Sequence, residues 1–193
     1  MCSESERWKI CDNSMKTLSD HILDIAQNSL NAKSTLIKIT VEMDKKNDLC
    51  ILKIKDNGCG MSREILEQAT NPFFTTRKTR KVGLGLSLLK QNAERAHGKF
   101  SIKSELNNGT EVEAVFQLSN VDRPELGDVW YTLYLTILSN KNVEIIYEHL
   151  TNSGRFKISS SEIRDNIEGI SMQQPDIREA IIEMIKNNIK DIQ

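Results

Sequence analysis

The stretch DHILDIAQNSLNAKS, residues 20–34, combines an apolar face with a row of short polar side chains. Its apolar residues recur at the spacing of an amphipathic helix, so we expect a helix over residues 18–32. Asp24, Asn28 and Asn31 follow one another at intervals of four and three residues and form a polar stripe along it. Asp and Asn are poor helix formers because their side chains compete for backbone hydrogen bonds. The stripe favours a helix that faces a ligand, and helix capping or interhelical hydrogen bonding by the two asparagines is the alternative.

The composition is that of a chain with an ordinary apolar core. Hydrophobic residues make up 38% of the 193 positions, charged residues 27%, and the formal net charge is −1. This charge predicts neither a nucleic acid nor an acidic membrane as a partner. No apolar run reaches the roughly 20 residues that cross a bilayer, and residues 1–14 lack the apolar core of a signal peptide. We therefore expect a cytoplasmic protein whose four cysteines are free thiols.

Hairpins and helices alternate in the first two thirds of the chain. The turn NNG, residues 107–109, joins two runs of alternating apolar and polar residues and is a strong hairpin signal. The predicted strands are residues 34–43, 49–56, 99–106 and 110–118, and the predicted helices are 18–32, 62–69 and 85–98. This order predicts an α+β fold, a two-layer α/β sandwich in which helices cover one face of a mixed, antiparallel-rich sheet.

After Val121 the sequence becomes more apolar and aromatic. We predict a helix over residues 129–140, a second hairpin across TNSG at 151–154, and helices over 160–169 and 175–192. Residues 1–14 are interpreted as an N-terminal tail and residues 122–193 as a small α/β C-terminal domain, an appendage without a catalytic cluster. The aromatic segment 129–135 could form a homodimer interface, a partner-docking surface or its own core, and we favour the core because apolar helical stripes are usually buried.

The stretch KDNGCGM, residues 55–61, places a carboxylate at a glycine-rich turn. Asp56 ends a predicted strand, and Gly58 and Gly60 permit a tight turn with close backbone approach to a ligand. A carboxylate held there can accept a hydrogen bond from an exocyclic amine such as that of adenine. An ordinary Asp-Asn-Gly turn after an edge strand is the alternative.

A second glycine pair, Gly83 and Gly85, opens the predicted helix at 85–98. Free N–H groups at a helix start form a phosphate-binding site, although the pattern is neither the Walker P-loop nor the dinucleotide fingerprint. The alternative is a helix entry at which glycine avoids a clash. The loop NPFFTTRKTRK before it, residues 71–81, holds four basic residues: Arg77, Lys78, Arg80 and Lys81. They could close over a polyphosphate, or belong to a solvated loop.

The polar stripe suits a metal-bound nucleotide. Mg²⁺ prefers hard oxygen ligands and takes only one or two of them from protein, so the side-chain carbonyl of Asn28 could bind it. Asp24, one turn earlier, could orient or activate a water molecule.

Taken in this order, the motifs resemble the GHKL superfamily of gyrase, heat-shock chaperone, histidine kinase and mismatch-repair ATPases. DIAQNSLNA looks like the N box, DNGCGM the first glycine box, NPFFTTR the F box of histidine kinases, VGLGLSLLK the second glycine box, and NGT a glycine–threonine element near the adenine. The resemblance covers about residues 18–118 and is nearest to a stand-alone histidine kinase catalytic domain. It implies the Bergerat-type ATP-binding fold for residues 15–121, with ATP and Mg²⁺ as cofactors.

The resemblance also implies roles for single residues. Asn28 stands at the Mg²⁺-binding position, Asp56 at the position that contacts the adenine amine, and Asp24 at the catalytic position. The predicted nucleotide-binding residues are Asn28, Asn31, Asp56, Gly58, Gly60, Met61, Thr75, Thr76, Arg77, Lys78, Gly83, Leu84, Gly85, Leu86 and Thr110.

Three positions depart from the family pattern. Asp24 replaces the glutamate of the hydrolytic members and is one methylene shorter, which weakens the case for fast water activation. Lys81 and Val82 replace a common Gly-Thr pair.

His21, one turn before Asp24, is expected near the nucleotide, and no phosphoacceptor histidine motif precedes the predicted ATP-binding region.

The resemblance implies, first, a signalling protein that binds ATP with Mg²⁺ and transfers the γ-phosphate to a residue on a separate partner protein, as a histidine kinase does. The alternatives are an anti-sigma-type serine kinase and a nucleotide-gated regulatory binding module with little turnover.

Overall fold

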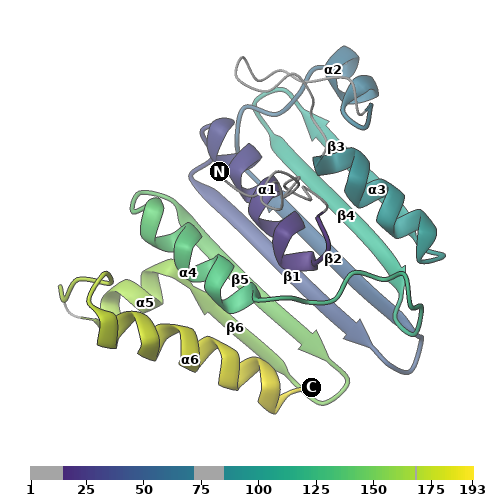
Figure 1. Ribbon diagram of the computed structural model, residues 1–193. Coiled ribbons are helices and arrows are strands. Elements are labelled where there is room, and N and C mark those ends of the chain that lie inside the picture. Colours follow the sequence, from purple (N-terminus) through teal and green to yellow (C-terminus); the bar gives the residue numbers. More distant parts are fainter. Residues whose placement is uncertain (1–14, 72–84, 168) are drawn as a thin grey trace, which may run out of the picture.

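The computed structural model describes residues 15–71, 85–167 and 169–193. Six strands form a single sheet in the order β3-β4-β2-β1-β5-β6 (Figure 1). β1 and β5 pair in parallel, and every other neighbouring pair is antiparallel, so the sheet is mixed. The elements are α1 (Leu18–Asn31), β1 (Leu36–Asp44), β2 (Leu49–Asp56), α2 (Arg63–Gln68), α3 (Gly85–Arg95), β3 (Lys99–Glu105), β4 (Gly109–Gln117), α4 (Val129–Ser139), β5 (Glu144–Thr151), β6 (Arg155–Ser159), α5 (Ser160–Asn166) and α6 (Pro175–Asp191).

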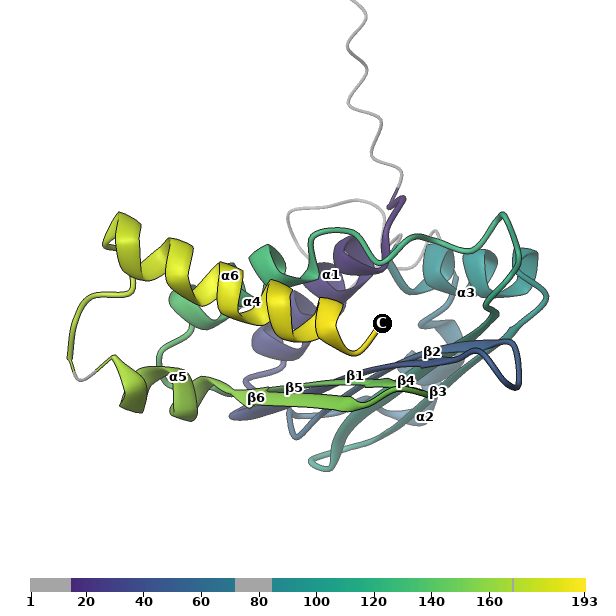
Figure 2. The same cartoon turned by 90° about the horizontal axis from the view of Figure 1, so that it is seen from below.

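Four helices, α1, α3, α4 and α6, lie over the same face of the sheet (Figure 2). Alternate residues of the strands are buried beneath them, as Ile37, Ile39 and Val41 of β1 illustrate. On the opposite face Lys53 forms ion pairs across the strands with Glu111 at 3.0 Å and Glu113 at 3.6 Å. The arrangement confirms the predicted α/β sandwich.

A reciprocal cap starts α1. The Thr17 hydroxyl accepts a hydrogen bond from the Asp20 amide at 3.2 Å, and the Asp20 carboxylate accepts one from the Thr17 amide at 3.0 Å. Apolar residues of α1 are buried against the sheet, whereas Asp24 and Asn28 are half-buried on another side. The helix therefore keeps its polar stripe away from the core.

Helix α3 ends earlier than the predicted helix 85–98. His97 adopts a left-handed backbone with φ of 54°, which stops the helix after Arg95. A Cβ atom on Gly98 would lie 1.7 Å from the Val115 carbonyl oxygen, so only glycine lets the chain enter β3 so close to β4.

The C-terminal region continues the sheet and the core of the first region. β5 pairs with β1 from Leu36↔Glu144 to Met43↔Thr151, and buried residues of α4 and α6 belong to the same apolar cluster as those of α1. The predicted hairpin across 151–154 and the three predicted helices are present. The predicted boundary at residue 121 falls in the turn before α4. In the described ranges we find no helix with the length and apolarity that crossing a membrane requires.

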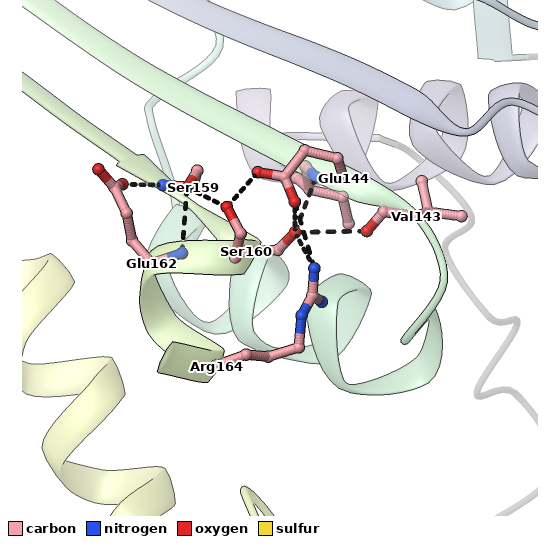
Figure 3. A network of polar contacts seen from close by, with 8 residues as sticks. Val143, Glu144, Ser159, Ser160, Glu162 and Arg164 are labelled. Carbon is pink, nitrogen blue, oxygen red and sulfur yellow. Dashed lines mark hydrogen bonds and ion pairs between the residues drawn. The ribbon is translucent and has the colours of Figure 1, made fainter. Parts of the chain in front are cut away.

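A polar network fixes α5 against the sheet (Figure 3). The last β5–β6 pair is Ile146↔Ser159. Beyond it, the Ser160 hydroxyl accepts a hydrogen bond from the Ile145 amide at 3.0 Å. Ser160 also donates to the Glu144 carboxylate at 2.8 Å, while Arg164 donates to Ser160 at 2.9 Å and to Glu144 at 3.2 Å. Side chains thus satisfy backbone groups that the sheet leaves unpaired where β6 ends.

Candidate functional site

Asp56, the last residue of β2, is held by three hydrogen-bond donors. Its Oδ2 accepts from the Ser29 hydroxyl at 2.7 Å, and its Oδ1 accepts from the Gly58 amide at 2.8 Å. The Ser34 hydroxyl lies 3.2 Å from Oδ1 and shares its single hydrogen with the Ser29 carbonyl oxygen at 2.6 Å. The residue is only 8% exposed, and a buried carboxylate needs such partners. A carboxylate offers about four acceptor sites. Acceptor capacity therefore remains for a donor on a ligand.

Three glycines bring backbone segments close together beside Asp56. A Cβ atom on Gly60 would lie 1.9 Å from the Glu105 carbonyl oxygen, and one on Gly109 would lie 2.0 Å from the Asp56 carbonyl oxygen. Both glycines have positive φ values, 63° and 80°. A Cβ atom on Gly58 would meet the Ser34 hydroxyl oxygen at 2.7 Å. The DNGCG turn and the NGT element, far apart in sequence, therefore meet where β2 ends and β4 begins.

Thr110 lies opposite Asp56 in the β2–β4 pair. Ser104 of β3 connects it to the loop after β2: its hydroxyl oxygen lies 2.9 Å from the Thr110 hydroxyl and accepts the Met61 amide at 2.9 Å. The predicted residues Met61 and Thr110 are thus linked through a serine that the sequence analysis did not identify.

Asp24, Asn28 and Gly85 meet where α1 approaches the start of α3. Asn28 Nδ2 donates to Asp24 Oδ2 at 3.3 Å. A Cβ atom on Gly85 would lie 1.8 Å from the same Asp24 oxygen, so a larger residue there would displace the Asp24 carboxylate from its position. Backbone N–H groups at a helix start favour anions. The structure therefore brings Asp24 and Asn28 of the polar stripe together with Gly85, the described member of the second glycine pair.

The other predicted residues lie as follows. Asn31 is exposed on α1 and accepts a hydrogen bond from Gln27 at 3.3 Å. Leu86 is half-buried and packs on the core. The predicted residues Thr75, Thr76, Arg77, Lys78, Gly83 and Leu84 lie outside the described residues.

His21 of α1 is fully buried where this helix faces α3. Asn92 Nδ2 of α3 donates to His21 Nε2 at 2.9 Å, so the neutral ring carries its proton on Nδ1. That Nδ1 atom has no hydrogen-bond partner within the described ranges. Burial lowers the pKa of His21 to about 4, against an opposing effect of Asp20.

Four site residues escaped the sequence analysis: Ser29, Ser34, Asn92 and Ser104. Ser29 follows Asn28 directly, so its position beside the stripe was a usable signal. Ser34 lies in the connection between α1 and β1 and donates back to the Ser29 carbonyl at 2.6 Å. Asn92 and Ser104 are brought in by helix packing and strand register, which have no local signature in the sequence.

The donor set suits Mg²⁺ only together with a phosphate ligand. Within the described ranges, no group of three or more His, Cys, Asp or Glu side chains could hold a metal ion. Mg²⁺ takes one or two protein ligands and completes its shell with phosphate oxygens and waters. The contact between Asn28 and Asp24 uses the amide nitrogen of Asn28, so the amide oxygen is the atom that would bind the ion.

A groove of about 550 Å³ lies elsewhere, between β6, α5 and α6. Its lining is mainly apolar and includes none of the predicted site residues: Phe156, Ile158, Ile167, Ile177, Ile181 and Met184 contribute most of the apolar side chains.

Known proteins resemble about half of the chain. A sensor protein of Shewanella frigidimarina (strain NCIMB 400) is 40% identical to this chain over 103 residues. The match covers 52% of this chain and 16% of that protein. Sporulation kinase D of Bacillus subtilis (strain 168) is 34% identical over 109 residues, 54% of this chain and 21% of the kinase. The chain therefore spans only a small part of the curated relatives it matches.

A solved structure agrees with the observed fold. The N-terminal domain of a DNA repair protein superposes with a TM-score of 0.54 at 17% identity, covering 76% of this chain and 52% of that one. At this identity the likeness shows the fold alone. The model of the histidine kinase-, DNA gyrase B- and HSP90-like ATPases matches residues 12–120, which is more than half of the chain. The chain therefore belongs to this ATPase family, as the resemblance of its motifs predicted.

Proposed function

We propose that the protein binds ATP with Mg²⁺ in the cytoplasm and transfers the γ-phosphate to a residue on a separate partner protein, in the manner of a histidine kinase. The observation that carries the proposal is the contact between Asp24 of α1 and the start of α3 at Gly85. It joins a carboxylate and an amide side chain to a helix N-terminus, which is the combination that a metal-bound phosphate needs. The sporulation kinase among the relatives supports the reaction class, and the sensor protein supports a role in signalling.

In this proposal each residue has one task. Asp56 accepts a hydrogen bond from the adenine amino group, and Thr110 lies opposite Asp56 on β4. The backbone amides at the start of α3 bind phosphate oxygens, and the Asn28 amide oxygen binds Mg²⁺. The ion, when bound, neutralises charge that develops on the transferred phosphate. Asp24 orients the attacking group.

A nucleotide-gated binding module is the second candidate. Asp24 is shorter than the glutamate of hydrolytic relatives, and its Oδ2 is engaged by Asn28. Both features reduce its capacity as a general base, so nucleotide binding without turnover would also fit.

Phosphate transfer separates these functions. We would incubate the protein with γ-labelled ATP, Mg²⁺ and the protein fraction of its source cells, using the Asp24→Asn variant as a control. Acid-labile label on a second protein, absent with the control, supports the histidine kinase. Acid-stable label indicates a serine kinase, and no label indicates a binding module; either result overturns the proposed transfer to histidine.

Replacing Asn28 by alanine should remove the Mg²⁺ dependence of ATP binding. We expect the native protein to bind ATP at least about tenfold more tightly with Mg²⁺, because even an outer-shell partner of a metal contributes that much. The variant should bind equally well with and without the ion in calorimetric titrations. Gln27→Ala, an exposed change on the same helix, is the control and should keep the dependence. A variant that retains the full effect of Mg²⁺ would exclude Asn28 as the ligand.

A further inference from the structure

Helices α1 and α3 touch through polar groups at both ends of their contact. At one end Asp24 lies against Gly85, and at the other Asn92 donates to His21 at 2.9 Å. The earlier residue of α1 meets the later residue of α3, so the two helices run in opposite directions, as Figure 1 shows. The His21–Asn92 bond thus lies at the end of the interface away from the candidate phosphate site.

The surroundings of this bond are apolar. Ile22 and Ile25 of α1 and Leu89 and Ala93 of α3 are buried. Apolar side chains alone tolerate sliding and repacking of one helix on another. A directional hydrogen bond from the half-buried Asn92 to the buried His21 specifies one register, and fixing a register is the best-attested use of buried polar residues.

The start of α3 must keep a fixed position relative to α1. With the Asp24 carboxylate where it lies, no methyl group fits at Gly85, since a Cβ atom would lie 1.8 Å from it. α3 is a continuous helix of 11 residues, so a displacement at Asn92 also moves Gly85. A misplacement of about 1 Å at a reacting group can reduce a rate by about two orders of magnitude.

We infer that His21 and Asn92 are positioning residues, which hold the first turn of α3 at the distance from Asp24 that phosphate binding requires. The inference rests on the proposed binding of ATP. It assigns a use to a buried histidine whose Nδ1 is left without a partner in the described part of the chain.

The test compares a ligand with phosphates to one without. For Asn92→Ala and His21→Leu we expect the Kd of ATP with Mg²⁺ to rise about tenfold, below the largest effect of a misplaced group. The Kd of adenosine, measured by NMR titration, should change less than about twofold, because the Asp56 end of the site is untouched. His21→Gln offers an amide oxygen that can accept from Asn92, and should restore ATP binding to within about threefold.

Two controls make the outcome decisive. Glu94→Ala changes an exposed residue of α3 and should leave both affinities unchanged. Urea unfolding of His21→Leu should show no loss of stability, because an apolar side chain suits the buried position. Equal loss for ATP and adenosine, or no loss in either variant, overturns the inference while ATP binding by the native protein stands. Failure of the native protein to bind ATP overturns the proposed function and this inference together.

Discussion

Asp56→Ala is expected to abolish measurable ATP binding. The change removes the acceptor proposed for the adenine amino group and leaves the Ser29 and Ser34 hydroxyls and the Gly58 amide without the carboxylate they bind. A hydrogen bond to a charged group contributes about 1.5–3 kcal/mol, which corresponds to roughly 10- to 150-fold in Kd, and the unpaired donors add to this loss. Isothermal titration calorimetry with ATP and Mg²⁺ measures the effect.

Asp56→Asn separates recognition of the base from disruption of the pocket. The amide keeps the size of the carboxylate and one acceptor oxygen, but its NH₂ group can donate to a ligand. We therefore expect weaker ATP binding and a smaller preference for ATP over ITP, whose base carries an oxygen in place of the amino group. Asp122→Asn, at an exposed position after β4, should leave both affinities unchanged. An unaltered ATP-to-ITP ratio in Asp56→Asn would exclude Asp56 from base recognition.

The second large effect expected is a loss of stability between pH 7 and pH 5. Burial lowers the pKa of His21 and of His149 from 6.5 to about 4 in the folded protein. Below pH 6.5 the unfolded chain binds protons that the folded chain does not, so stability is complete above that pH and falls as the pH approaches 4. Each ring contributes about 2 kcal/mol to this loss at pH 5. Urea unfolding at the two pH values measures the difference.

Single substitutions assign the pH effect to each ring. His21→Gln and His149→Gln should each remove about half of the loss between pH 7 and pH 5, since the two shifts are similar. His97→Gln is the control, because His97 is exposed and should leave the loss unchanged. Hydrogen bonds from Asn152 and Asn47 lower the pKa of Asp44 to about 2. Protonation of that carboxylate therefore changes stability only below the pH range compared here. A loss of stability that keeps its full size in both single variants would contradict the assignment.

Local pattern was sufficient for most elements of the fold. The 3.6-residue period of residues 18–32 predicted α1, and the alternation around NNG predicted the β3–β4 hairpin, because both signals depend on residues close together in the chain. The order of the motifs was also sufficient to identify the family, since each motif is a short run with its own chemistry. The end of α3 was predicted too late, because the helix stops at the left-handed His97 and Gly98 then approaches β4, a contact between segments that are separate in the sequence.

The sequence by itself determined which elements form, which family the chain belongs to and which residues are candidates for its site, because periodicity, turn chemistry and motif order are local properties. Only the tertiary structure decided that β5 joins β1 in parallel, so that residues 122–193 continue the sheet instead of forming one of their own. It alone also decided that Ser29 and Ser34 hold Asp56 and that Asn92 meets His21. The reason is physical: contacts between distant segments depend on which sheet edge is open and on the register of strands and helices, and neither is encoded in any short run of residues.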